Sequence, residues 1–100
     1  QVEQYVVDLV LTTRTPSAYG ADRLAGLIEH GASPRASINL NLAARGHALM
    51  QQRAYVTPDD VRAVAPEVLA HRIVRTYEAE AEGIAATDLV QDVLDTVEVP

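Results

Sequence analysis

The sequence SPRASINLNLAARGHALMQQ occupies residues 33–52 and carries the clearest helix signal in the chain. Ser33 is a typical N-cap residue, and Pro34 suits the first turn because a proline there gives up no hydrogen bond. Residues 38–42 alone alternate like a strand, but small and apolar residues then continue at helical spacing. The pattern therefore predicts a helix. The residues expected on its buried face are Ile38, Leu42, Leu49 and the small residues between them.

Weaker signals precede this helix. Residues 2–14 repeat apolar side chains at helical spacing, which predicts a helix, although four valines leave a strand as the minor alternative. Pro16 ends that segment. Residues 22–30 predict a short helix closed by Gly31, and the segment is also short enough to be irregular.

Further helices are predicted after residue 56. Thr57 and Pro58 repeat the same start pattern, and two acidic residues follow in the first turn, where the helix dipole favours them. Pro66 is expected to kink this helix or to divide it into two. Residues 77–82 are polar and acidic, and residues 87–97 predict a last amphipathic helix. Together the segments predict an all-α fold, a small bundle of four to five helices.

The composition indicates one small globular domain over residues 1–100. The chain is 48% hydrophobic and 22% charged, and its net charge of −6 argues against binding to nucleic acid or to an anionic membrane. It has no cysteine, which excludes disulfides and thiolate chemistry, and no lysine for Schiff-base or P-loop chemistry. The residues given do not open with a basic and then apolar segment, and no apolar run is as long as a membrane span. We expect a cytoplasmic protein.

Motifs for independent catalysis are missing. The sequence contains no glycine-rich phosphate loop, no nucleophile elbow and no metal-binding histidine pair. His30, His47 and His71 lie in three different segments, so we expect structural histidines and no metal site. The acids at 78, 80 and 82 are typical of a solvated face. Ser33 has no recognisable histidine and acid partners and is interpreted as a helix cap.

One short segment, residues 31–36 (GASPRA), favours a binding function. Arg35 falls in the first turn of the predicted helix, where the dipole disfavours a cation unless an anion joins it. Gly31 permits a close backbone approach just before it. The segment therefore suggests a phosphate or carboxylate partner. The alternative is that Arg35 pairs with an acid of its own bundle.

GASPRA also resembles the signature of the C-terminal lid subdomain of MoxR-type AAA+ ATPases. Other similar segments stand in the family's order along the chain, at residues 5–14, 43–48, 53–61, 68–73 and 82–84. Residues 17–29 match only loosely, so the resemblance does not specify their conformation. The resemblance covers nearly the whole chain and implies a bundle of the AAA+ lid type.

The resemblance implies a function that depends on partners. In such ATPases a preceding α/β domain holds ATP and Mg²⁺, and the helical lid closes over the nucleotide. Arg35 matches the sensor 2 arginine, which reaches the γ-phosphate, with Ser33 and Pro34 beside it. The family implies an ATP hydrolase with neighbouring subunits in a homo-oligomer, a hexamer, and a chaperone-like role toward an unidentified protein client. This chain has no Walker A or Walker B sequence, so alone it should not hydrolyse ATP.

The chain begins at Gln1 without a methionine, and we expect it to be a piece of a longer ATPase polypeptide. The alternative function is a free-standing acidic helical domain that binds proteins. A histone-like dimer is suggested by residues 57–61 but disfavoured by the negative charge. Arg14 is expected to stabilise a helix end. For Arg45 and Arg72 the sequence does not distinguish a structural role from a contact with a neighbouring subunit.

Overall fold

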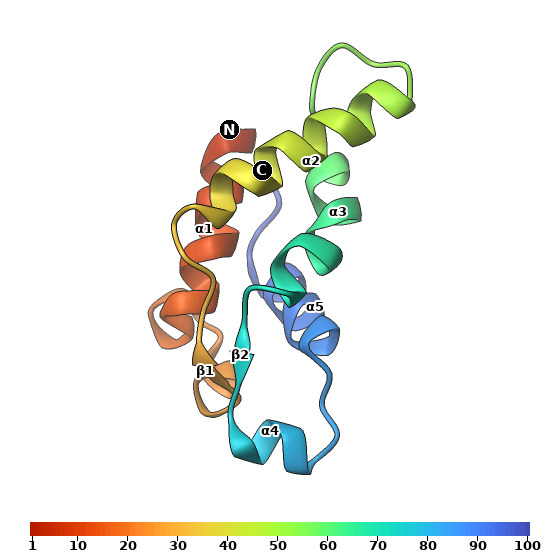
Figure 1. Cartoon of the computed structure of the whole chain (residues 1–100). Helices are drawn as coiled ribbons and strands as arrows, with labels where there is room; N and C mark the ends of the chain where they lie inside the picture. The colour runs from red at the N-terminus through yellow and green to blue at the C-terminus, as the bar shows by residue number, and fades with distance from the viewer.

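The computed structural model describes residues 1–100 and contains five α-helices and a pair of very short strands (Figure 1). The helices are α1 (Val2–Arg14), α2 (Ala36–Met50), α3 (Pro58–Ala70), α4 (Tyr77–Ala81) and α5 (Ala86–Thr96). The strands are β1 (Ile28–His30) and β2 (Val74–Arg75). The expected all-α bundle is confirmed. None of the helices is long and apolar enough to cross a bilayer.

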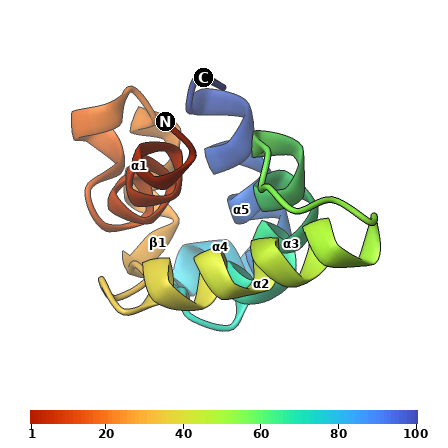
Figure 2. The same ribbon diagram turned by 90° about the horizontal axis from the view of Figure 1, so that it is seen from above.

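The core lies between α1, α2, α3 and α5. Seen from above, α2 runs along one side of the molecule, with α1 and α3 packed against it and α5 behind (Figure 2). The largest fully buried apolar side chains are Tyr5, Val6, Leu9, Leu24, Leu40, Val61, Leu69, Leu89, Val90 and Val93. The predicted helices at 2–14 and 87–97 are confirmed, since both α1 and α5 contribute to this list.

The buried face of α2 differs from the predicted one. Its fully or almost fully buried residues are Ala36, Leu40, Ala44 and Ala48, which recur every four residues. Ile38, Leu42 and Leu49 point outward and are 59%, 58% and 69% exposed. The prediction that these three lie in the core is therefore wrong. Three alanines let α2 approach its neighbours closely, so the small residues, with Leu40, make the contact.

Residues 22–30 do not form the predicted α-helix. A 3₁₀ turn over Asp22–Gly26 leads into β1, which pairs antiparallel with β2, placing Ile28 opposite Arg75. The Thr76 N–H extends the pairing by donating to the Leu27 carbonyl (3.0 Å). The partner strand lies more than 40 residues away, and a local pattern carries no information about it.

Helix α3 begins as predicted and continues through Pro66 without dividing. Thr57 is the N-cap and Pro58 the first helical residue. A proline in a helix interior removes one backbone hydrogen bond. Burial of Ala65 and Leu69 on either side of Pro66 offsets that loss, so the expected division into two helices is wrong.

Candidate functional site

The segment before α2 is fixed against the end of α1. A Cβ atom at Gly31 would overlap the Thr13 carbonyl and lie 2.6 Å from the Arg14 nitrogen, so only glycine fits there. The next residue, Ala32, is fully buried, and its N–H donates to Thr13 Oγ1 (3.0 Å). That hydroxyl in turn donates to the Val10 carbonyl (2.6 Å). The glycine of GASPRA thus serves a close backbone approach.

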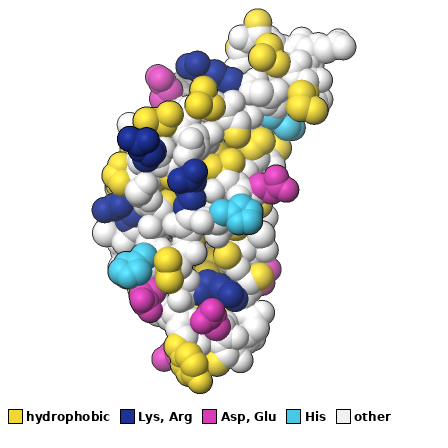
Figure 3. Space-filling model, in the orientation of Figure 1, with side chains coloured by type: hydrophobic (Ala, Val, Ile, Leu, Met, Phe, Trp, Pro, Cys, Tyr) yellow, Lys and Arg dark blue, Asp and Glu magenta, His cyan; other side chains and the backbone are white.

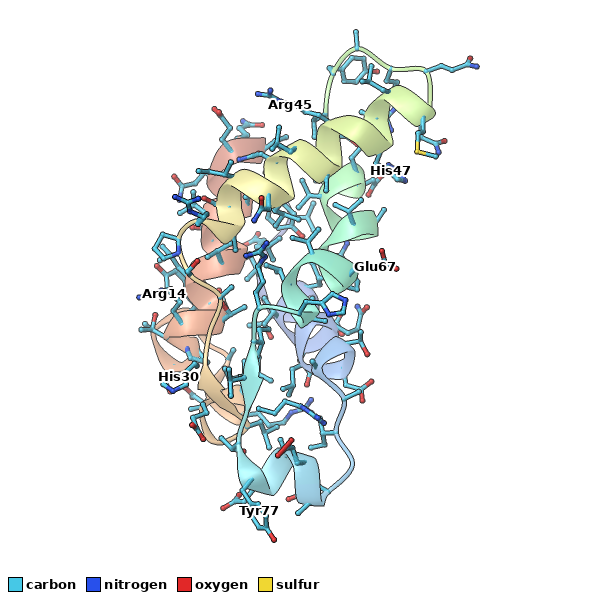
Figure 4. The ribbon with its side chains drawn as sticks, in the orientation of Figure 1. Arg14, His30, Arg45, His47, Glu67 and Tyr77 are labelled. Atoms are coloured by element: carbon cyan, nitrogen blue, oxygen red, sulfur yellow. The ribbon has the colours of Figure 1, made fainter.

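Arg14 anchors the same segment from the last turn of α1. Its Nη1 donates to the Ala32 carbonyl at 3.4 Å, and its side chain lies beside the loop that leads into α2 (Figure 4). The expected structural role of Arg14 at a helix end is confirmed. With both the N–H and the carbonyl of Ala32 bonded, the backbone leading to Arg35 has a defined course.

The start of α2 uses backbone carbonyls where a side-chain cap was predicted. The Ala36 N–H donates to the Ser33 carbonyl (2.8 Å), and the Ser37 N–H donates to the Pro34 carbonyl (3.1 Å). The Ser33 side chain is exposed and makes no capping bond, so its prediction as N-cap is wrong. These two amides are therefore already hydrogen-bonded within a tight turn and do not need a side-chain cap. An anion at this end of α2 would therefore meet the guanidinium of Arg35 in preference to free amides.

Arg35 is exposed and has no ion pair or hydrogen bond through its side chain. Other arginines are engaged: Arg23 with Asp92, Arg53 with Asp60, Arg75 with Glu80, Arg14 with the Ala32 carbonyl, and Arg62 with Tyr5 and the Leu94 carbonyl. The remaining three, Arg35, Arg45 and Arg72, are all exposed and unpaired. The alternative that Arg35 pairs with an acid of its own bundle is therefore wrong.

Several arginines are visible on one face of this acidic chain. In Figure 3 arginine side chains are spread over this face, from the level of α2 downward, with acidic side chains beside the uppermost and lowermost of them. Only Arg35, Arg45 and Arg72 lack a partner within the chain, and an unpaired exposed guanidinium can bind an anionic group.

A second polar cluster joins α2 to α3 and was not predicted. Its centre is the fully buried carboxylate of Asp60, which accepts two 2.6 Å hydrogen bonds from Arg53. It also interacts with His47 Nδ1 (2.7 Å) and accepts from the Thr57 N–H (2.8 Å). The spacing of Thr57 and Asp60 is that of a capping box, which is the signal that could have identified the pair. His47 is thereby a structural histidine, as expected.

Arg53 holds the pKa of Asp60 well below its usual range, with further hydrogen bonds from Thr57 and His47 acting in the same direction against the effect of burial. A lowered pKa in the folded state stabilises the fold above the ordinary aspartate pKa of about 3.9, and this contribution is lost as the pH falls.

We expect Asp60→Asn to destabilise the chain by roughly 3 kcal/mol at pH 7, because Arg53 loses its charged partner. The difference from the wild type should shrink by about 1 kcal/mol between pH 5 and pH 3, because only the wild type loses the carboxylate contribution. Urea unfolding at several pH values measures both quantities. A difference that stays constant with pH would contradict the assigned pKa shift.

The other polar candidates are solvated. His30 and His71 are exposed, as are the acids at 78, 80 and 82. Among these acids, Glu80 lies 3.5 Å from Arg75. No three histidine or acidic side chains come together in a way that could hold a metal ion.

Comparison with known proteins identifies the family. Residues 20–93 match the AAA lid domain family. The chain belongs to that family. The lid domain is 45% identical over 96 residues to Chaperone MoxR1 of Mycobacterium tuberculosis, covering 96% of this chain and 26% of the relative. It is 40% identical over 106 residues to Protein MoxR of Methylorubrum extorquens, covering 99% of this chain and 30% of the relative.

A solved structure supports the same grouping. A putative ATPase from Cytophaga hutchinsonii superposes on the lid domain with a TM-score of 0.92 at 44% identity, over 98% of this chain and 30% of that one. The resemblance to MoxR-type lid domains is confirmed. The lid domain spans about a quarter to a third of the length of these relatives.

Proposed function

We propose that this lid domain is part of a longer AAA+ ATPase and closes over ATP held by a preceding α/β domain. The observation that carries the proposal is the exposed, unpaired guanidinium of Arg35 at the start of α2. The backbone before it is bonded to α1 through Thr13 and Arg14. Family membership supports the proposal, as does the greater length of the relatives.

Arg35 is proposed to be the sensor 2 arginine, with Ser33 and Pro34 lining the same approach to the nucleotide. A guanidinium offers several N–H donors in a plane and keeps its charge, which suits contact with a terminal phosphate. Contact with the γ-phosphate would stabilise the charge that spreads over it during transfer. Once that phosphate leaves, one link between the lid and the nucleotide is lost, and the lid is free to move.

The remaining machinery would lie outside these 100 residues. The free guanidinium of Arg35 suits a phosphate of ATP. We assign Mg²⁺ to the preceding domain because the chain belongs to the AAA lid family. Mg²⁺ there would neutralise phosphate charge. We further propose assembly with neighbouring subunits into a ring, a cytoplasmic location and a chaperone-like action on a protein client. One relative's name, Chaperone MoxR1, supports the last point.

The first test is the coding sequence that flanks these residues, followed by ATP hydrolysis by the full-length protein. We expect a nucleotide-binding domain encoded upstream and measurable hydrolysis that depends on Arg35. A gene that encodes these 100 residues alone would contradict the proposal and favour a free-standing interaction domain.

A further inference from the structure

Two adjacent threonines near the end of α1 are fully buried, and only one of them forms a hydrogen bond outside its own helix. Thr12 Oγ1 donates to the Asp8 carbonyl (2.7 Å) and makes no other bond. Thr13 Oγ1 donates to the Val10 carbonyl (2.6 Å) and also accepts from the Ala32 N–H (3.0 Å). A hydroxyl can donate and accept at once. The Thr13 hydroxyl therefore joins α1 to the loop that leads into α2.

The Ala32 amide depends on this one acceptor. Ala32 is fully buried, and a buried N–H without an acceptor is costly. The two backbones also touch beside the bond, because a Cβ atom at Gly31 would lie 2.2 Å from the Thr13 carbonyl oxygen. Loss of the Thr13 hydroxyl is therefore expected to displace the loop from α1, since displacement lets the Ala32 amide reach another acceptor.

A displacement at Ala32 would be carried to Arg35, because the backbone between them has little freedom. The proline ring fixes φ at Pro34. The Ser33 carbonyl accepts from the Ala36 N–H (2.8 Å), and Arg35 has helical backbone angles (φ −63°, ψ −23°). The guanidinium itself is exposed and unpaired. The backbone of Arg35 is thus held in place while its side chain is free to bind.

We propose that Thr13 is a positioning residue for Arg35, and that its hydroxyl makes α1 and the backbone of Arg35 move as one body. This inference rests on the proposed function. Through the bond between Thr13 and Ala32, contact of Arg35 with the γ-phosphate sets the orientation of α1, and departure of the phosphate releases it. A misplacement of about 1 Å can cost about 10²-fold in rate, so a hydroxyl that does not touch ATP can control its recognition.

The affinities of the full-length protein for a non-hydrolysable ATP analogue and for ADP, measured by calorimetry, test the proposal. Thr13→Val replaces the hydroxyl with a methyl group of similar size. We expect it to weaken binding of the analogue by about fivefold or more, because Arg35 is misplaced, and to leave ADP affinity within about twofold of the wild type. Thr13→Ser keeps the hydroxyl and should restore analogue affinity to within about twofold of the wild type.

The matched control is Thr12→Val, which makes the same change at the neighbouring, equally buried position. Both variants lose one bond to a carbonyl of α1, but only Thr13→Val loses the bond to Ala32. Both nucleotide affinities of Thr12→Val should lie within about twofold of the wild type, because the loop before α2 keeps its acceptor. Equal losses of analogue affinity for Thr12→Val and Thr13→Val would overturn the proposal, as would wild-type affinity in Thr13→Val.

A double variant tests whether Thr13 acts through Arg35. Thr13→Val combined with Arg35→Ala should bind the analogue no more weakly than Arg35→Ala alone, because the misplaced group is already gone. Additive losses would overturn the proposal. Failure of the proposed function gives a different result, since Arg35→Ala alone would then leave analogue binding unchanged. A selective loss in Arg35→Ala without one in Thr13→Val would refute only the role of Thr13.

Arg14→Ala weakens the same loop contact from an exposed position. Its Nη1 donates to the Ala32 carbonyl at 3.4 Å, and its side chain lies beside the loop (Figure 4). Thermal unfolding shows which variants are folded at the assay temperature. If Thr13→Val is not, Arg14→Ala should still weaken analogue binding by about threefold, the equivalent of one ordinary hydrogen bond, without a change for ADP. Unchanged analogue affinity in Arg14→Ala would then overturn the proposal.

Discussion

ATP turnover by the full-length protein is expected to fall on the order of 10²-fold when Arg35 is replaced by alanine, the usual cost of losing one donor to a charged transition state. The side chain is exposed and makes no hydrogen bond or ion pair within the lid domain, so its loss should not alter the fold. Steady-state phosphate release measures the effect. Thermal unfolding of the same variant should give a melting temperature within about 2 °C of the wild type, because the change removes no buried contact.

The matched control for this variant is Arg23→Ala. Arg23 is also exposed, but it pairs with Asp92 on a surface away from α2. An exposed pair of this kind contributes little to stability. We expect turnover within about twofold of the wild type, because the Arg23 guanidinium already pairs with Asp92 and is not part of the proposed nucleotide contact. If Arg35→Ala hydrolysed ATP at the same rate as Arg23→Ala, Arg35 would have no role in the reaction.

Leu40→Ala is expected to destabilise the chain by about 2–5 kcal/mol, because it leaves a cavity beneath α2 at a fully buried position. Leu42→Ala, two residues along the same helix, removes the same atoms from a side chain that is 58% exposed, and should cost less than about 1 kcal/mol. Urea midpoints of the two variants give the comparison. A larger loss for Leu42→Ala would mean that the buried and exposed faces of α2 have been exchanged.

The same helix shows what a sequence can and cannot specify. Helical spacing predicted that α2 exists. It did not predict which face is buried, because α2 carries an alanine-rich side and a side of large apolar residues. Size and hydrophobicity assign Leu42 and Leu49 to the core, whereas close packing against α1 and α3 selects the alanines.

Non-local contacts account for the other differences. The pairing of β1 with β2 joins segments that are distant in sequence. The role of Asp60 depends on His47, which approaches it from α2, and on Arg53, which approaches it from the loop that follows α2. The packing of Gly31 against Thr13 is equally invisible in a local pattern. In contrast, the Thr57 start of α3 was predicted from residue type and position alone.

The most direct test of Arg35 as a γ-phosphate sensor is the affinity of the full-length protein for a non-hydrolysable ATP analogue and for ADP, measured by calorimetry. If Arg35 contacts the γ-phosphate, Arg35→Ala should weaken binding of the analogue by about tenfold or more, the equivalent of one charge-assisted hydrogen bond, and leave ADP affinity unchanged. Equal changes for both nucleotides, or no change for either, would contradict that role.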